Sequence, residues 1–170
     1  MESCQPGYDS AEGFCTFNGL MVTALALLEQ GAVRSIGILD CDVHYGNGTD
    51  DIVKRLGVQG IRHHTMGAHF RHRDEASLFE QWLDRAIEDC RGVDLLIYQA
   101  GADPHVNDPL GKVLTGVQMA KRDHAVFSAF QGRPLVWNLA GGYQRDVNGG
   151  IEPVLKLHRT TAQIQNIYQP

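Results

Sequence analysis

The fold is decided by residues 35–44, which read SIGILDCDVH. Residues 35–39 form a short apolar run, the pattern of a strand buried on both faces of a parallel sheet. In the residues that follow, Asp40, Asp42 and His44 alternate, so they point to the same side of an extended chain. This stretch therefore predicts a buried parallel strand that ends in a group of polar side chains.

The rest of the chain alternates between helical and strand patterns. Helices are expected over residues 18–30, 49–55, 77–90, 115–130 and 153–167, and strands over 35–39, 60–66, 94–98 and 134–139. Thr49 is expected to cap the second helix, and Ser77 with Glu80 to form a capping box on the third. Val117 and His124 are expected in or near the buried stripe of the fourth helix. This order predicts an α/β protein in three layers, α/β/α, with a mostly parallel sheet.

Length and composition are those of one globular domain, taken as residues 1–170. The chain is 43% hydrophobic and 21% charged, with a formal charge of −5. The acidic balance argues against direct nucleic-acid binding, and no apolar run reaches the roughly 18 residues of a membrane span. No stretch has the pattern of a signal peptide, and the four cysteines form no CxxC pair. Reduced thiols and a cytoplasmic location are therefore expected.

Polar residues that a core would not tolerate follow three of the expected strands. Asp42 and His44 follow the first strand, Asp103 follows the third, and Tyr143 follows the fourth after a pair of glycines. Ligands of open parallel sheets bind beyond the carboxyl ends of the strands. Two carboxylates and an imidazole at that edge predict a metal site, and a tyrosine hydroxyl can donate to a developing oxyanion. This combination suits metal-dependent amide hydrolysis.

Each of these features also has a plainer interpretation. The acids can simply leave the strand into solvent, Asp103 can belong to an ordinary turn, and Tyr143 can lie on the surface. A further alternative starts from the pair Asp40-x-Asp42, which phosphatases of the haloacid dehalogenase type also carry after a strand. Those enzymes need Thr or Val two residues after the second Asp. This chain has His44 there, which argues against a phosphatase.

Four motifs extend the pattern across most of the chain. They are residues 13–18 (GFCTFN), 40–49 (DCDVHYGNGT), 101–104 (GADP) with 108–111 (DPLG), and 141–143 (GGY). In these motifs and their order the chain resembles the zinc-dependent histone deacetylase family, which includes the acetylpolyamine amidohydrolases. The resemblance implies an arginase-like α/β/α fold. Because the catalytic domain of that family is considerably longer, residues 1–170 are expected to be a partial domain that lacks the N-terminal part.

The resemblance also implies roles for individual residues. The implied zinc ligands are Asp42, His44 and Asp103. Tyr143 would polarise the carbonyl of an acetylated lysine or acetylpolyamine. The implied substrate-binding residues are Gly13, Phe14, Gly141 and Gly142, of which Phe14 would line the channel for the acyl-lysine side chain. The residues implied near a potassium ion are Asp40, Thr65 and Met66. Asp40 would also orient a catalytic histidine.

The chain departs from the family in the segment before residue 13. Family members carry a tandem histidine pair there, one of which is the general base, whereas residues 3–12 contain no histidine. The later pair, His63 and His64, is expected to be structural. Because loss of a general base lowers a rate by about 10²–10⁴-fold, weak or absent deacetylase activity is expected. The alternative is a non-catalytic module that binds metal or a partner, or self-associates through an exposed sheet or helix surface.

Overall fold

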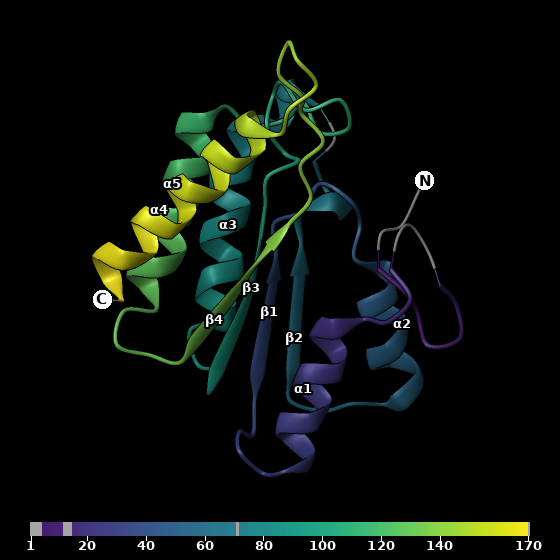
Figure 1. Ribbon diagram of the computed structural model, residues 1–170. Coiled ribbons are helices and arrows are strands. Elements are labelled where there is room, and N and C mark those ends of the chain that lie inside the picture. The colour runs from purple at the N-terminus through teal and green to yellow at the C-terminus, as the bar shows by residue number, and fades with distance from the viewer. Residues whose placement is uncertain (1–4, 12–14, 71, 170) are drawn as a thin grey trace.

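The computed structural model describes residues 5–11, 15–70 and 72–169, and its centre is a parallel sheet (Figure 1). The strands are β1 (Ile36–Asp40), β2 (Ile61–Thr65), β3 (Leu95–Gly101) and β4 (Leu135–Ala140). They lie in the order β2-β1-β3-β4, and every neighbouring pair is parallel. The predicted strands are confirmed, and β3 continues beyond its expected end to Gly101.

The helices form a layer on each face of this sheet (Figure 1). One layer contains α1 (Gly19–Glu29) and α2 (Asn47–Leu56). The other contains α3 (Ala76–Cys90), α4 (Gly116–Ala129) and α5 (Glu152–Tyr168). Two short 3-10 turns, Met66–Ala68 and Arg73–Glu75, connect β2 to α3. The predicted three-layer α/β/α architecture is confirmed.

The core has two parts because alternate residues of each strand face opposite layers. Ile38 and Ile97 pack with α1, while Leu39 and Leu96 pack in the larger cluster under α3, α4 and α5. All four are almost completely buried. Burial of an aliphatic side chain contributes about 1.5–3 kcal/mol, so these strands hold both layers to one rigid platform.

The cap predicted for α2 is wrong. Gly46 occupies the N-cap position, and Thr49 lies inside the first turn, where it is buried. The Thr49 hydroxyl donates to the Gln5 side chain, with 2.6 Å between Oγ1 and Oε1. The hydroxyl oxygen accepts from Asn18 Nδ2 at 3.0 Å, so Thr49 contacts side chains outside the helix and does not cap α2, which begins at Asn47.

The capping box predicted for α3 is also displaced. His72 and Glu75 form the box, one turn before the expected pair of Ser77 and Glu80. The 3-10 turn that they cap runs directly into α3, which therefore starts at Ala76. A capping box is therefore present before α3, but it is formed by His72 and Glu75 and not by Ser77 and Glu80.

The inward face of α4 differs from the predicted stripe. Val117 and His124 are exposed, whereas Arg122 and Asp123 are almost completely buried. The guanidinium of Arg122 donates to Asp123 across 2.9 Å, so the two charges enter the core as a pair. A buried charge is tolerated when it is paired and hydrogen-bonded, which allows this face of the helix to turn inward.

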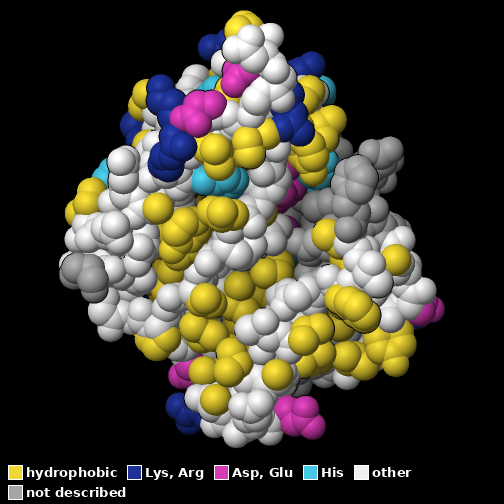
Figure 2. Space-filling model, in the orientation of Figure 1, with side chains coloured by type: hydrophobic (Ala, Val, Ile, Leu, Met, Phe, Trp, Pro, Cys, Tyr) yellow, Lys and Arg dark blue, Asp and Glu magenta, His cyan; other side chains and the backbone are white. Residues whose placement is uncertain are grey.

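The outer part of the sheet is less covered near β4. A groove between α1 and β4 is lined in part by Leu20, Ile97 and Val136. Figure 2 shows hydrophobic side chains across the middle of this side of the molecule. Self-association through such a surface stays a prediction. Among the described residues, none of the helices combines the length and apolar character needed to cross a membrane.

Candidate metal centre

Three side chains that follow β1 and β3 converge at the carboxyl edge of the sheet. Asp42, His44 and Asp103 each offer a ligand atom, and these atoms lie within 4.8 Å of one another. His44 Nδ1 lies 2.8 Å from Asp42 Oδ1 and 3.0 Å from Asp103 Oδ2. The two strands are hydrogen-bonded neighbours, so their ends necessarily meet here. The structure thus brings together the residues that the sequence nominated as a metal site.

Hydrogen bonds from backbone N–H groups to the carboxylates fix the loop after β1 around this group. The backbone N–H of His44 donates to Asp42 Oδ1 at 2.8 Å, and that of Val43 donates to Asp103 Oδ1 at 3.1 Å. Asp42 and Asp103 are almost completely buried, while His44 is partly exposed. The open side of the group therefore lies at His44.

Asp103 carries the clearest sign that the group is built for a cation. Its Oδ2 is buried and forms no well-aligned hydrogen bond among the described residues, although His44 Nδ1 lies 3.0 Å away. Burial, followed by the charge of Asp42, raises the pKa of Asp103 to about 7, against the lowering effect of His44. A buried carboxylate beside a second carboxylate is costly unless a positive charge compensates it. A divalent cation between these side chains would remove that cost.

Asp40 stands behind the group and is fixed by amide side chains. Its Oδ2 accepts from Gln5 Nε2 at 2.7 Å, and its Oδ1 accepts from Gln99 Nε2 at 2.9 Å. The backbone N–H of Asp42 also donates to Oδ1, at 3.1 Å. Burial, reinforced by the charge of Asp42, raises the pKa of Asp40 well above its ordinary value. Asp40 therefore orients the ligand loop and does not itself belong to the three converging donors.

Gly141 and Gly142 let the loop after β4 pass directly beside Asp103. Gly141 has φ +56°, and a Cβ built there would overlap the carboxylate of Asp103. Gly142 has φ +107°, and a Cβ there would crowd Val154. Both the left-handed backbone and the close approach require glycine. The two glycines thus bring the next residue, Tyr143, to the site.

The ring of Tyr143 lies edge-on to His44. The ring centroids are 6.2 Å apart and the planes meet at 79°. The backbone N–H of Tyr143 donates to Asp108 Oδ2 at 2.7 Å, and Asp108 is completely buried. Asp108 also accepts from the backbone N–H of Leu110 at 3.0 Å. One carboxylate therefore fastens the loop of Tyr143 to the loop that follows Asp103.

Several residues that build the site escaped the sequence interpretation. Gln5 and Gln99 hold Asp40, and Arg122 donates to the carbonyl of Gly101 at 2.8 Å, where the loop to Asp103 begins. No local pattern marks the two glutamines. The adjacent charges Arg122 and Asp123 inside an apolar helical stripe were a usable signal, because such a pair on the buried side needs a partner.

The remaining predicted site residues lie at the edges of the site or outside the described part. Thr65 pairs with Asp40 in the sheet register, and its hydroxyl accepts from the backbone N–H of Gly46 at 3.2 Å. Met66 follows it and is completely buried. Gly13 and Phe14 lie outside the described residues. A potassium ion near Asp40, Thr65 and Met66 stays a prediction.

The tandem pair His63–His64 is divided between the two faces of β2. His63 Nδ1 lies 2.7 Å from Asp50 on α2, and His64 Nε2 lies 2.9 Å from Asp89 on α3. Successive residues of a strand point to opposite sides, so the two imidazoles cannot act together. These contacts agree with the expectation that the pair is structural.

The three converging donors fit a catalytic zinc site in their chemistry. Catalytic zinc is bound by about three nitrogen or oxygen ligands and keeps further positions for water and substrate. Two carboxylates and one imidazole, with a partly exposed edge and a tyrosine beside it, meet that requirement. Fold and site together describe an α/β protein with a candidate metal centre whose donors follow the ends of neighbouring strands.

Comparison with known proteins points to one family. Residues 7–70 match the histone deacetylase domain family. An acetylpolyamine amidohydrolase of Mycoplana ramosa is 35% identical over 114 residues, which cover 64% of this chain and 29% of that protein. An uncharacterized protein of Picosynechococcus is 27% identical over 178 residues, covering 94% of this chain and 59% of that protein.

A solved structure agrees with the fold. The crystal structure of an acetylpolyamine aminohydrolase from Burkholderia pseudomallei superposes with a TM-score of 0.76 at 19% identity, covering 97% of this chain and 54% of that one. The chain therefore spans only part of the length of the relatives that it matches. Its sequence is similar to the histone deacetylase family over residues 7–70, and its fold is that of the acetylpolyamine aminohydrolase structure.

Proposed function

We propose that this chain forms the metal-binding portion of a zinc-dependent amide hydrolase that removes acetyl groups from lysine side chains or polyamines. The observation that carries the proposal is the convergence of Asp42, His44 and Asp103, with a buried Asp103 oxygen that forms no well-aligned hydrogen bond among the described residues. The family supports the reaction class, and the amidohydrolase of Mycoplana ramosa supports an acetylated amine as substrate.

The roles of the side chains follow from their positions. Asp42, His44 and Asp103 would hold the zinc ion, which when bound supplies a Lewis acid for the amide carbonyl and for water. Tyr143, edge-on to His44, would donate its hydroxyl proton toward the oxyanion that develops on that carbonyl. The formal charge of −5 favours the approach of cationic substrates such as acetylpolyamines. We also propose that Gly13 and Phe14 line the substrate channel. The proposed location of the protein is the cytoplasm.

The rate expected for this reaction depends on Gln5. Its side-chain amide donates a hydrogen bond to Asp40, and an amide accepts no proton near neutral pH, so Gln5 cannot act as a general base. An imidazole there could donate one N–H to Asp40 and offer its other nitrogen as a base. We therefore expect slow hydrolysis by this chain, and an increase of at least about ten-fold in the variant Gln5→His.

The test measures acetate release from an acetyl-lysine peptide and from N-acetylputrescine in the presence of zinc. The chain is expected to release acetate slowly, and Tyr143→Phe should lower that rate while leaving zinc binding intact. Tyr8→Phe serves as the matched control, because Tyr8 is exposed and far along the chain from the three donors. No acetate release by either the chain or Gln5→His would contradict the hydrolase.

A second function is favoured by the same glutamine. If the amide of Gln5 fixes Asp40 without taking part in proton transfer, the chain would bind metal and a partner without turnover. Light scattering distinguishes a discrete assembly from a monomer. Stoichiometric zinc together with a defined oligomer and no turnover in Gln5→His would favour this non-catalytic module.

A further inference from the structure

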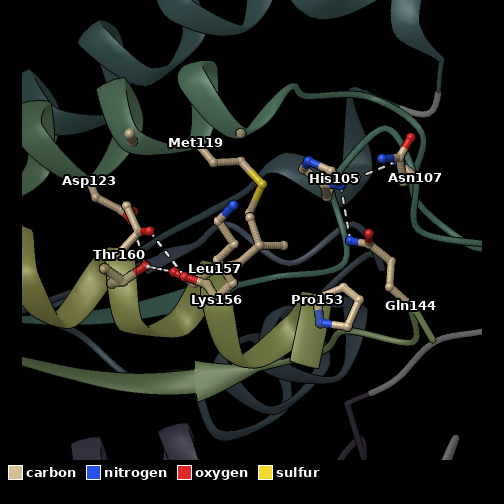
Figure 3. A pocket seen from close by; sticks show the side chains of 12 residues that line it. His105, Asn107, Met119, Asp123, Gln144, Pro153, Lys156, Leu157 and Thr160 are labelled. Carbon is tan, nitrogen blue, oxygen red and sulfur yellow. Dashed lines mark hydrogen bonds between the residues drawn. The ribbon is translucent and has the colours of Figure 1, made fainter. Parts of the chain in front are cut away.

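A second pocket lies between α4 and α5, on the layer that covers the far side of β3 and β4. It has a volume of about 350 Å³, within the range of small-molecule pockets. Met119 and Ala120 of α4 and Pro153 and Leu157 of α5 give it apolar walls (Figure 3). None of these four belongs to the candidate metal centre. The pocket is thus a separate, mostly apolar space with an opening to solvent.

One end of this pocket carries a fixed hydrogen-bond donor. His105 Nδ1 accepts from the backbone N–H of Asn107 at 3.3 Å and lies 3.0 Å from Gln144 Nε2 (Figure 3). Because Nδ1 acts as an acceptor, the hydrogen of the neutral ring is on Nε2. That nitrogen would lie 3.7 Å from a Cβ built on Gly116, the first residue of α4, which also lines the pocket. His105 therefore presents an N–H toward the space.

The other end carries a positive charge. Lys156 extends from α5 toward Met119 across the pocket (Figure 3), and among the described residues it forms no ion pair. The carboxylate in the lining, Asp123, is paired with Arg122 and also accepts from the Thr161 hydroxyl at 2.6 Å. Because the charge of Asp123 is already compensated, Lys156 gives the pocket a net positive charge.

The donor end is continuous with the candidate metal centre. His105 follows Asp103 by two residues, and the largely buried Gln144 follows Tyr143 directly. The contact between His105 and Gln144 joins the two loops that carry these residues. A molecule that contacts His105 would therefore lie next to the two loops that carry Asp103 and Tyr143.

We propose that this pocket binds a small monoanion with an apolar body, a carboxylate in the first instance. The carboxylate would pair with Lys156, the apolar body would lie between α4 and α5, and a polar atom at the far end would accept from His105. This inference does not depend on the proposed hydrolase activity, because binding is measured without turnover.

The experiment uses 3-phenylpropanoate as the probe and isothermal titration calorimetry on the whole chain. Binding is expected, with shifts of the backbone amide signals of His105 and Gln144 in NMR spectra. The uncharged analogue 3-phenylpropan-1-ol should bind about ten-fold more weakly, and so should the acid to Lys156→Met, since a charge-assisted hydrogen bond is lost in each case. Lys156→Arg should restore the affinity. Lys54→Met is the control, because Lys54 is exposed on α2.

A further variant separates this pocket from the metal centre, where a carboxylate could also bind. Asp42→Ala should leave the affinity for 3-phenylpropanoate unchanged if the probe occupies the pocket. Binding that survives in Lys156→Met but disappears in Asp42→Ala would overturn the proposal. So would the absence of any binding at millimolar probe. Neither result would bear on whether the chain hydrolyses acetylated amines.

Discussion

The two sides of the candidate metal centre are held by different means. On one side, the loops after β1, β3 and β4 grow directly out of the sheet, and Asp103 is fixed by its strand, by Arg122 and by the close passage of Gly141. On the other side, Gln5 comes from an irregular segment and is held by hydrogen bonds to Asp40 and Thr49. The first side provides the three candidate metal donors, whereas the second provides a neutral amide.

In the proposed function, this difference would separate metal binding from proton transfer. The candidate donors are positioned by the sheet, so metal binding would depend on the fold as a whole. Gln5, which stands against Asp40, belongs to a segment outside the sheet, and the hydrogen bonds that hold its described residues each involve a side chain. A different residue at this position would therefore leave the sheet undisturbed. Substitutions on the two sides should therefore differ in effect, and the largest loss of stability is expected on the sheet side.

Removal of Arg122 should damage the sheet side most. Burial works against its charge, but the Asp123 carboxylate raises the pKa of Arg122 above the ordinary value, so the guanidinium stays charged in the core. In Arg122→Met the buried Asp123 loses its ion pair and the carbonyl of Gly101 loses a donor. A loss of about 3–5 kcal/mol in the free energy of unfolding is expected in urea denaturation. Arg85→Met, at an exposed position of α3, should change it by less than about 0.5 kcal/mol. Equal midpoints for both variants would refute this role of Arg122.

The close passage of Gly141 gives the next largest effect. Gly141→Ala should lower the free energy of unfolding by about 3 kcal/mol, because it adds backbone strain and a clash with Asp103. Gly132→Ala is a matched control, since Gly132 has φ +72° and nothing within 4 Å of its Cβ position. Gly132→Ala therefore measures the backbone strain alone, for which a loss of about 1 kcal/mol in the free energy of unfolding is expected. If chemical denaturation gave the same loss for both variants, the loop would not press against Asp103.

The N-terminal side should yield the smallest change in stability. Gln5→Ala removes the donor to Asp40 and the acceptor of the Thr49 hydroxyl, for an expected loss of about 1–2 kcal/mol. The zinc affinity should fall much less than in variants of the three donors. Thermal unfolding and a chelator competition measure the two quantities on the same sample. A loss of zinc as complete as in Asp103→Asn would show that the two sides are not separable.

The parts of the molecule that follow from strand order were predictable from the sequence. The apolar run before Asp40 fixes a buried strand, and parallel neighbours must end at the same edge, so Asp42 and Asp103 had to meet there. The glycine pair before Tyr143 likewise indicated a sharp turn, which the positive φ values confirm. In each case a backbone rule that holds for any sequence placed the side chain.

The parts that sequence reasoning missed depend on contacts between distant segments. Thr49 was expected to cap α2, but its hydroxyl donates a hydrogen bond to Gln5, which lies 44 residues earlier in the chain. Val117 and His124 were expected to be buried, but the pairing of Arg122 with Asp123 turns the helix so that those charges face inward. Neither partner can be identified from local periodicity, because each contact exists only once the layers have packed.

Metal binding by the strand-end donors is measured most directly as the zinc content per chain. The protein is purified, supplied with zinc, passed through a desalting column and analysed by inductively coupled plasma mass spectrometry. One zinc ion per chain is expected, with at least about a 100-fold weaker affinity in Asp103→Asn and no change in Asp84→Asn, whose side chain is exposed on α3. A chain that retains no zinc, or that retains it equally well in Asp103→Asn, would contradict the account.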